Sequence, residues 1–521
     1  MFQPAGPISV RDTNGADAGP TWRRCVSLLR RCSDERLLRS IHALFLIHGL
    51  HRHTFPLSRL VLAACSLGGG CLLYASLILR HSPAPPNSFI FNTLIHAHAR
   101  GSDPIPALQY FRLMLRSPDP SVAPDHHSFP FAIAACIAIP SFPSGTQIHT
   151  FVIKNGLVSA DHFVQTAVLR LYAQNHDDLR RAQKMFDEIP QRDAVHYDVL
   201  MNGYLRRHAP SESLSLFHDM LAAGVDTDKH AITTALTACS YAGALQQGLW
   251  IHRYLNEKHR DFLSDTYIVS ALITMYAKCG CIDEALKVFD EMPERNSFVW
   301  AAMAGGFAAH GFAHEALRCL RRMAEDDGLR PDGIVILSAM AACAHAGLVE
   351  EGLKLLAEME ARYAVIPEHE HYSCAVDMLC RVGRLPEAVE LIGKMPMRPL
   401  ASVWGSLLAG CRMHNNVELA ELAVEDLQRI AGQGGEDEWV FVQMSNIYLS
   451  ANRREDARRI RKMIGRRGVK KTAACSVIEV NGEVCSFVAT DPAHRRLPEI
   501  LWILHAFLEH AGDEGFSCDL L

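Results

Sequence analysis

The residues that come nearest to a metal site lie in the stretch PEHEHYSCAVDMLC, which holds two histidines and two cysteines. His369, His371, Cys374 and Cys380 are all residue types that bind zinc. Cys374 and Cys380, however, fall on the apolar face of a predicted helix. This placement favours burial in a core over metal binding, so we predict that no metal binds here.

Other catalytic patterns are missing from the sequence. The closest approach to a Cys-x-x-Cys zinc motif is Cys279 with Cys281, which is one residue too short. We find no glycine loop that would cradle a phosphate and no Gly-x-Ser-x-Gly nucleophile elbow. We therefore predict that the chain is not an enzyme, that it needs no cofactor, and that it has no small-molecule substrate.

A basic run is the second chemically distinctive segment. Residues 458–471, RRIRKMIGRRGVKK, contain eight Lys or Arg in 14 positions. Such a cluster could bind RNA phosphates. It is equally typical of a solvated helix face whose cations lie near the helix C-terminus. Because the net charge of the whole chain is −5, a polyanion would have to be held by local patches or by specific side chains.

Short polar side chains recur at regular places along the chain. Some fall inside successive predicted helices, and others stand just before helices. The first group is Asn92, Thr166, Asp198 and Ser270, and the second is Asp125, Asp193, Asp228 and Asn296. These side chains could hydrogen-bond to the edge of an RNA base. For the second group, a role as helix N-caps is an equally good interpretation.

The regular places reflect an internal period of about 103 residues. Independent landmarks agree on it, namely Pro190, Pro293 and Pro396; Cys136, Cys239 and Cys343; and His149 with His252. Within one stretch, 266–296, two apolar helical faces are separated at Gly280, and the second face ends at Pro293. Such a helix pair can bury both faces only by stacking on its neighbours. The period therefore predicts an all-α fold, an α-solenoid of helix-turn-helix repeats.

The totals agree with a repeat array. A chain of 521 residues is too long for one hydrophobic core, and its 16 scattered cysteines fit a reducing compartment. Residues 60–79 carry no charge and are long enough to imitate a membrane span. Gly68, Gly69 and Gly70 interrupt that segment where a helix pair would turn, so we predict two buried helices and no membrane span.

Motifs in each repeat identify a family. FNTLIHAHARG (91–101), GTQIHTFVIKNGL (145–157) and ALITMYAKCGCIDEALKVFDEMPERN (271–296) resemble the P, L and S repeats of plant pentatricopeptide repeat (PPR) proteins. VWGSLLAGCRMHNNVELAELA (403–423) resembles the start of the E extension of this family, and residues 444–471 its second half. CSVIEVNGEVCSFVATDPAH (475–494) is similar to the short segment that follows, although Val477 stands where the family has Trp and Arg495 where it has Pro.

The resemblance implies an organisation. It predicts a disordered or targeting segment at 1–21, a PPR array at 22–400, an E extension of two degenerate helical repeats at 401–471, and an E+-like tail at 472–521. The array would form a right-handed superhelix. Asn481-Gly482 suits the two-residue turn of a short β-hairpin. The repeats are placed at 22–53, 54–87, 88–125, 126–161, 162–193, 194–228, 229–265, 266–296 and 297–332, with a final L and S pair at 333–400.

In this family the fifth and last residues of a P or S repeat together select one RNA base. Carried over to this chain, the resemblance predicts one preference for each repeat. The pairs are Ser58 with Asn87 for adenine, Asn92 with Asp125 for uracil, Thr166 with Asp193 for guanine, Asp198 with Asp228 weakly for a pyrimidine, and Ser270 with Asn296 for adenine. Ala301 with Asp332 should tolerate several bases, because alanine has no hydrogen-bonding group.

The resemblance also implies a function. The chain should be a sequence-specific factor that binds single-stranded organellar RNA and specifies sites of C-to-U editing. A deaminase of its own would need a Cys-x-x-Cys motif, and we expect no such domain after His494. Its partners would then be a deaminase-bearing PPR protein and editing accessory factors in trans, in the mitochondrion or alternatively the chloroplast. A splicing or stability factor without an editing role and a protein-binding scaffold are the alternatives.

Overall fold

The computed structural model describes residues 20–139, 141–156, 161–175, 179–431, 438–466, 475–480, 483–488, 498–499 and 501–503. The predicted targeting segment, up to residue 19, and the predicted Asn481-Gly482 turn lie outside these ranges. The chain divides into two compact units. Unit 1 comprises residues 1–207 and 220–226, and unit 2 comprises residues 208–219 and 227–521.

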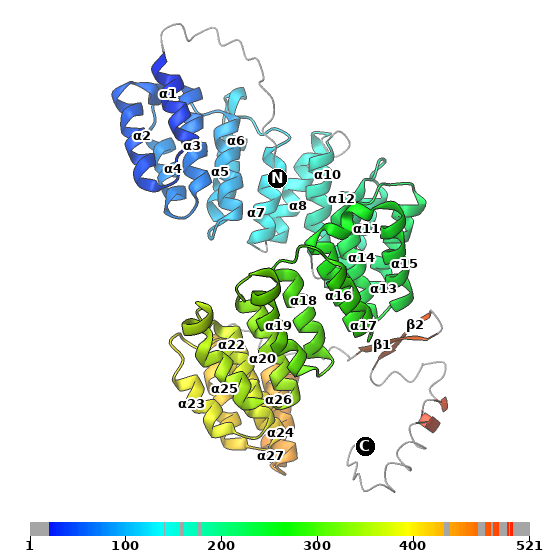
Figure 1. Cartoon of the computed structure of the whole chain (residues 1–521). Helices are drawn as coiled ribbons and strands as arrows, with labels where there is room; N and C mark the ends of the chain where they lie inside the picture. The colour runs from blue at the N-terminus through cyan, green and yellow to red at the C-terminus, as the bar shows by residue number, and fades with distance from the viewer. Residues whose placement is uncertain are drawn as a thin grey trace. The chain divides into compact units, whose positions relative to one another are not determined.

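Unit 1 is built from short α-helices joined by turns (Figure 1). Its helices are α1 (Pro20–Leu29), α2 (Glu35–Ile47), α3 (Thr54–Leu67), α4 (Gly70–His81), α5 (Ser88–Arg100), α6 (Ile105–Arg116), α7 (Ser128–Ala138), α8 (Phe142–Lys154), α10 (His162–Ala173), α11 (Arg180–Asp187) and α12 (Ala194–Arg206). Short 3-10 turns at Leu50–Arg52 and Pro120–Val122 complete the described part. Helix α13 (Pro210–Ala222) contributes residues to both units.

Unit 2 continues the same pattern. Its helices are α14 (Lys229–Ala242), α15 (Leu245–Lys258), α16 (Thr266–Lys278), α17 (Ile282–Glu291), α18 (Ser297–Ala309), α19 (Ala313–Asp327), α20 (Gly333–Ala346), α21 (Val349–Glu358), α22 (His369–Arg381), α23 (Leu385–Gly393), α24 (Ala401–Met413), α25 (Val417–Ala431), α26 (Glu438–Ser450) and α27 (Arg454–Arg466). A 3-10 turn at Arg260–Ser264 follows α15, and a π-turn at Met359–Tyr363 follows α21.

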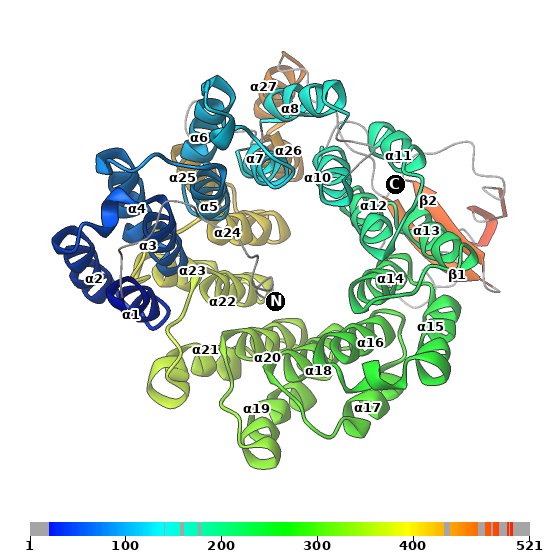
Figure 2. The ribbon, with the colours of Figure 1, turned by 90° about the horizontal axis from the view of Figure 1, so that it is seen from above.

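The helices form two layers within each unit. In unit 2 the first helix of each pair packs on the first helix of the next, so α14, α16, α18, α20, α22 and α24 lie side by side. Figure 2 shows α15, α17 and α19 in a second layer on the outer side of this row. In unit 1 the helices α3, α5, α7, α10 and α12 are stacked in the same way. The prediction of an all-α solenoid is confirmed.

The uncharged segment 60–79 is a helix pair. Helix α3 ends at Leu67 and α4 begins at Gly70. Between them Gly68 and Gly69 adopt φ angles of 66° and 51°, a backbone conformation that residues with a side chain rarely reach. None of the helices in the described ranges is long and apolar enough to cross a membrane.

Burial of the cysteines and histidine contacts between neighbouring repeats account for two of the periodic landmarks. The cysteines Cys136, Cys239 and Cys343 are buried in the core. A ring nitrogen of one histidine meets the hydroxyl of a tyrosine in the next repeat three times along the chain. These histidine–tyrosine contacts are His42 with Tyr74 at 2.7 Å, His149 with Tyr172 at 2.8 Å, and His252 with Tyr276 at 2.8 Å. The histidines that recur with the 103-residue period are therefore residues that join one repeat to the next.

Two short strands follow the last helix of unit 2. Strand β1 (Cys475–Val480) and strand β2 (Glu483–Val488) pair in antiparallel orientation. The register places Cys475 opposite Val488 and Val480 opposite Glu483.

Candidate nucleic-acid interface

The last residue of a repeat caps the helix that opens the next repeat. In each case a side-chain oxygen accepts a hydrogen bond from a backbone N–H three residues later, as N-cap residues do. The capping residues and distances are Asn87 to Ile90 N at 3.1 Å, Asp193 to His196 N at 3.1 Å, Asp228 to Ala231 N at 2.8 Å, and Asn296 to Val299 N at 3.2 Å. The N-cap interpretation is confirmed for Asp193, Asp228 and Asn296. It is wrong for Asp125, because the N-cap of α7 is His127 and Asp125 instead accepts from the N–H groups of His127 and Ser128 in the turn before that helix.

Asn92 and Asp125, the predicted uracil pair, are in direct contact. Asn92 Nδ2 donates to Asp125 Oδ1 at 2.9 Å and lies 3.2 Å from Oδ2. Ser128 Oγ donates to Asn92 Oδ1 at 2.7 Å. Burial raises the pKa of the Asp125 carboxyl, but the hydrogen bonds from Asn92, Ser128 and His127 outweigh it and lower the pKa. Asp125 is therefore an anionic acceptor facing the amide of the fifth residue.

Thr166 and Asp193, the predicted guanine pair, are linked through two histidines. His196 Nδ1 lies 2.6 Å from Asp193 Oδ1, and its Nε2 lies 3.4 Å from Thr166 Oγ1. His162 Nε2 lies 2.8 Å from Asp193 Oδ2. The sequence interpretation missed both histidines. The available signal for His196 was its position three residues after the N-cap, where a side chain can return a hydrogen bond to the cap.

Burial, hydrogen bonds and neighbouring charges set the protonation states of Asp193 and His196. Burial raises the pKa of Asp193, but hydrogen bonds from His196 and the nearby His196 and His162 rings outweigh it, so the pKa is lowered. Burial lowers the pKa of His196, and Asp193 offsets this only in part. A carboxylate beside a neutral imidazole is the expected state at neutral pH.

The same cluster brings three potential metal ligands within 4.8 Å of one another. Tetrahedral ligands around zinc would stand about 3.3 Å apart, as follows from bonds of about 2.0–2.1 Å. The separations of 2.6 and 2.8 Å are those of hydrogen bonds instead. Hydrogen bonding therefore accounts for how His162, Asp193 and His196 come together.

The stretch around His369 is also accounted for by other contacts. His369 Nε2 lies 3.0 Å from the Arg398 carbonyl, and His371 Nε2 lies 2.9 Å from the Gly333 carbonyl. Cys380 is buried in the core and the partly buried Cys374 packs against it, and burial raises the pKa of each thiol to about 12. Buried neutral thiols are poor metal ligands.

The two repeats whose fifth residue is a serine differ from the repeat whose fifth residue is Asn92. Ser58 Oγ donates to the Phe55 carbonyl at 2.7 Å, and Ser270 Oγ donates to the Thr266 carbonyl at 2.7 Å. Each hydroxyl thus uses its proton within its own helix and retains its acceptor oxygen. Within the described ranges neither serine hydrogen-bonds to the last residue of its repeat.

The remaining predicted pair spans the two units. Asp198, on α12, accepts a hydrogen bond from Asn202 Nδ2 at 2.9 Å. Asp228 caps α14 of unit 2. Because the two residues belong to different units, their joint selection of a base stays a prediction.

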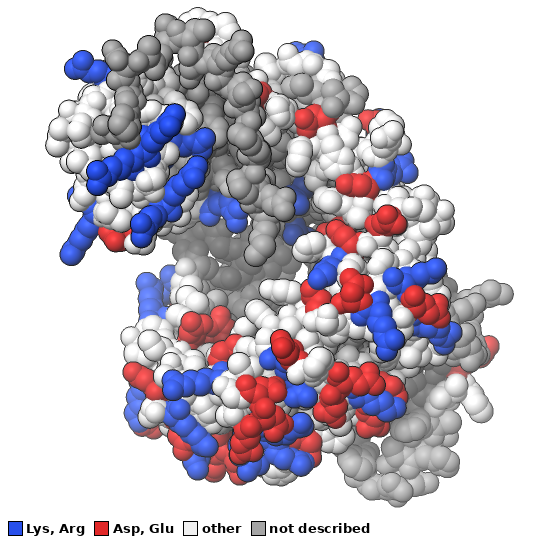
Figure 3. Space-filling model, turned by 45° about the horizontal axis from the view of Figure 1, so that its top comes forward, with Lys and Arg blue, Asp and Glu red and all other residues white. Residues whose placement is uncertain are grey.

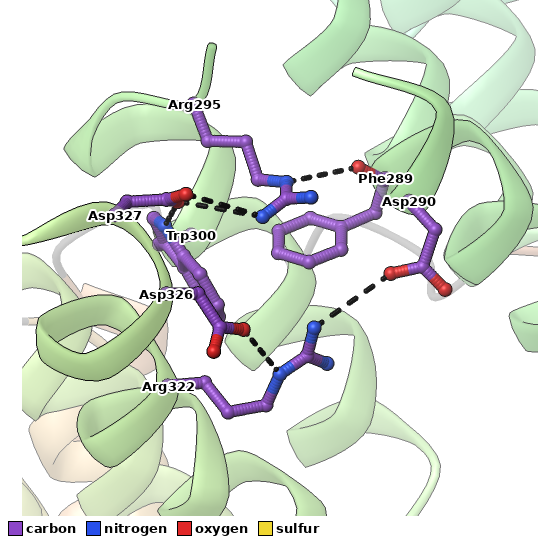
Figure 4. Close-up of polar contacts among 7 residues, drawn as sticks. All are labelled: Phe289, Asp290, Arg295, Trp300, Arg322, Asp326 and Asp327. Atoms are coloured by element: carbon purple, nitrogen blue, oxygen red, sulfur yellow. Dashed lines mark hydrogen bonds and ion pairs between the residues drawn. The ribbon is translucent and has the colours of Figure 1, made fainter. Parts of the chain in front are cut away.

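In two repeats, an arginine stands immediately before the last residue and stabilises the turn at the end of the repeat. Arg295 Nε donates to the Phe289 carbonyl at 3.2 Å, and the guanidinium lies over the Phe289 ring (Figure 4). Arg192 Nε makes the equivalent bond to the Phe186 carbonyl at 3.0 Å and lies over that ring. Neither contact was predicted. Each holds the loop from which the next residue, Asn296 or Asp193, enters its helix.

Arg295 also belongs to a cluster that joins α17, α18 and α19. Its guanidinium lies 3.3 Å from the Asp327 carboxylate, which accepts a hydrogen bond from Trp300 Nε1 at 2.7 Å. Arg322 lies over the rings of both Phe289 and Trp300 (Figure 4). The cluster therefore connects the repeat 266–296 with the repeat 297–332.

Charged side chains of both signs are mixed over the face of unit 2 drawn in Figure 3. Of the basic run, residues 458–466 lie on α27, where Arg458, Arg459, Arg461 and Lys462 are exposed. Arg459 pairs with Asp456 at 2.8 Å. The remainder, 467–471, lies outside the described ranges. A solvated helix face is therefore confirmed for the first part of the run, and RNA contact stays a prediction.

Comparison with known proteins agrees with this architecture. A PPR repeat model matches residues 89–118, 195–225, 267–297, 298–327, 337–363 and 370–400, and an E motif model matches residues 414–479. The solved structure of the pentatricopeptide repeat protein PPR10 in complex with an 18-nucleotide psaJ RNA element matches with a TM-score of 0.58 and 17% identity. The match covers 86% of this chain but only 64% of PPR10, and it shows a common fold.

Two Arabidopsis thaliana proteins align over nearly the whole chain. The pentatricopeptide repeat-containing protein At3g28640 is 48% identical over 93% of this chain and 96% of its own length. The pentatricopeptide repeat-containing protein At2g22410, mitochondrial, is 32% identical over 93% of this chain and 89% of its own length. Since full-length identity of this degree accompanies the matched repeats and the stacked helix pairs, the chain belongs to the pentatricopeptide repeat family.

Proposed function

We propose that this chain is a sequence-specific single-stranded RNA-binding factor that specifies sites of C-to-U editing in an organelle by recruiting a deaminase in trans. The observation that carries RNA reading is the contact between Asn92 and Asp125 at 2.9 Å. A carboxamide and a carboxylate that face each other at one repeat boundary offer both donors and acceptors to the edge of an unpaired base.

The repetition of this arrangement favours RNA over a protein partner. Short polar residues stand at the fifth and last places of successive repeats, and the caps hold the last ones in equivalent positions. A protein-binding groove has no need for one hydrogen-bonding group at every repeat. The RNA-bound relative PPR10 has the same fold.

The editing role rests on the E motif at 414–479. Its helices α25 and α26 pack on α24, the preceding helix, and α27 packs on α26, so the motif lies at the end of the array in unit 2, where it could hold a separate enzyme. The mitochondrial assignment in the name of At2g22410 supports mitochondrial placement, and the chloroplast is the alternative. A splicing or stability role remains the competing function, because it would need the array but not the E motif.

Two experiments separate these functions. Purified full-length chain is first incubated with a library of randomised single-stranded RNAs, and the bound molecules are sequenced. An enriched motif is expected, and its absence would contradict RNA reading. Transcripts of a plant line lacking this protein are then sequenced. Loss of editing at one or a few cytidines is expected, whereas intact editing with missing spliced RNA would establish the competing role.

A further inference from the structure

The first residue of a repeat contacts the carboxylate of the last residue of the same repeat in three places. In unit 1, His162 Nε2 lies 2.8 Å from Asp193 Oδ2. In unit 2, Lys229 Nζ lies 2.6 Å from Asp265 Oδ2, and Ser297 Oγ donates to Asp332 Oδ2. Three different side chains, imidazole, ammonium and hydroxyl, thus make the same contact at equivalent positions.

The contacts of Asp193 show which of its two carboxylate oxygens His162 occupies. Its Oδ1 accepts from the His196 backbone N–H at 3.1 Å and lies 2.6 Å from His196 Nδ1. Its Oδ2 is taken by His162. The His196 side chain is fully buried, whereas the His162 side chain is 46% exposed. An incoming base that donates to Asp193 therefore competes with the half-exposed His162, because the buried His196 cannot move into solvent.

Asp332 follows the same logic. Its Oδ1 accepts from the backbone N–H groups of Ile334 and Val335, both at 3.1 Å. Its Oδ2 is held by Ser297. One carboxylate oxygen is thus used by the helix cap, and the oxygen left for a base is covered by the first residue.

The covered oxygen is the one that could distinguish bases. Guanine and uracil carry an N–H group at the centre of the Watson–Crick edge, whereas adenine and cytosine carry a lone pair there. A free carboxylate oxygen accepts from the former and repels the latter. A first residue that donates to this oxygen competes with the N–H of guanine or uracil.

We propose that the residue that opens a repeat is a further specificity-determining residue, and that His162 and Ser297 weaken discrimination by occupying the carboxylate oxygens of Asp193 and Asp332. This inference rests on the proposed RNA-binding function. It adds a third side chain to the fifth and last residues of each repeat. The exposed ring of His162 and the hydroxyl of Ser297 act as occupants that the base displaces.

The chain supplies a matched control. The repeat 88–125 also ends in an aspartate, but there the fifth residue, Asn92, holds the carboxylate. Its first residue, Ser88, donates no hydrogen bond to Asp125 within the described ranges. Ser88→Ala should consequently leave base preference unchanged, although it removes the same hydroxyl as Ser297→Ala.

The test uses the full-length chain and the randomised single-stranded RNA library. Thr166→Asn first identifies the nucleotide that faces repeat 162–193. At that nucleotide, affinities for RNAs differing only in one base are measured for the wild type and for His162→Ala. The ratio of guanine to adenine affinity should rise by about two- to tenfold in His162→Ala, the range expected when one competing hydrogen bond is removed. Ser297→Ala should raise the preference for guanine or uracil in its own repeat.

The outcomes are distinguishable. Unchanged ratios in both alanine variants would overturn the proposal, and so would an equal loss of affinity for all four bases, which would indicate a phosphate contact or a fold defect. A shift in Ser88→Ala as large as that in Ser297→Ala would also overturn it. If the wild-type chain enriches no motif, the RNA-binding function itself fails, and this inference falls with it.

Discussion

Replacing Arg295 by methionine should destabilise the repeats around α18 by about 2–4 kcal/mol. The Arg295 and Asp327 side chains are only 14% and 17% exposed, and they lie 3.3 Å apart. Methionine retains most of the alkyl stem but leaves the Asp327 carboxylate with the Trp300 Nε1 donor at 2.7 Å. Removing one partner of a fully buried pair costs about 3–5 kcal/mol. Residual exposure reduces this cost, while the lost hydrogen bond to the Phe289 carbonyl adds about 1 kcal/mol.

Arg322 provides the matched control within the same cluster. Its guanidinium lies over the same two rings as that of Arg295, so both substitutions remove a cation–π contact. The Arg322 side chain is 42% exposed, and its partner Asp326 is 40% exposed. Exposed ion pairs of this kind contribute about 0–1 kcal/mol. Arg322→Met should therefore cost less than about 1 kcal/mol.

The assay is hydrogen–deuterium exchange of the amides in α17, α18 and α19, because repeat arrays open locally and the exchange rates report the local free energy. Adding Asp327→Asn to Arg295→Met should restore part of the lost protection, since the second change removes the unpaired charge. Equal losses in Arg295→Met and Arg322→Met would refute the argument from burial. Failure of Asp327→Asn to restore protection would assign the loss to packing instead of charge.

Four further predictions address other parts of the chain. Thr166→Asn should move the base preference of its repeat from guanine toward uracil in the RNA-selection assay, with other positions unchanged; an equal loss for all bases would make Thr166 a packing residue. Gly410→Ala would place a Cβ 2.4 Å from the Cys380 Cβ and should lower the free energy of unfolding by about 1–3 kcal/mol. In Gly305→Ala the new Cβ meets nothing nearer than 3.9 Å, so this change should raise the free energy of unfolding by about 0.5–1 kcal/mol. Thermal unfolding measures both effects. Burial lowers the pKa of the histidine of each histidine–tyrosine contact, so the unfolded chain binds more protons below about pH 6.5, and the melting temperature should fall from pH 7.5 to pH 5.5. Metal analysis of the purified chain should find no stoichiometric zinc, and one tightly bound zinc per chain would contradict the hydrogen-bonded interpretation of the His162 cluster.

The sequence predicted the features that local rules control. The break at Gly68 and Gly69 follows from backbone freedom. The helix starts at Thr54, Ser88, His162 and Thr266 coincide with the repeat boundaries that the resemblance to the PPR family implied.

Contacts between repeats could not be predicted in the same way. His162 and Asp193 are 31 positions apart, and Arg295 and Asp327 are 32 positions apart. Whether such residues come into contact depends on the packing geometry between helices, and a local sequence pattern does not predict that geometry. The 103-residue period showed that His149 and His252 recur, but it did not indicate that each meets a tyrosine of the next repeat.

The helix caps also explain why so few residue types stand at the repeat ends. A capping residue needs a short side chain with an acceptor oxygen, which restricts the choice largely to Asp, Asn, Ser and Thr. The same requirement suits a residue that must also reach a base edge. Asp332 uses one oxygen for the cap and has the other beside Ser297, so capping and base reading are compatible in one carboxylate. We infer that capping limits which side chains a repeat can use for reading, and that neighbouring residues then decide how much of each remains available to RNA.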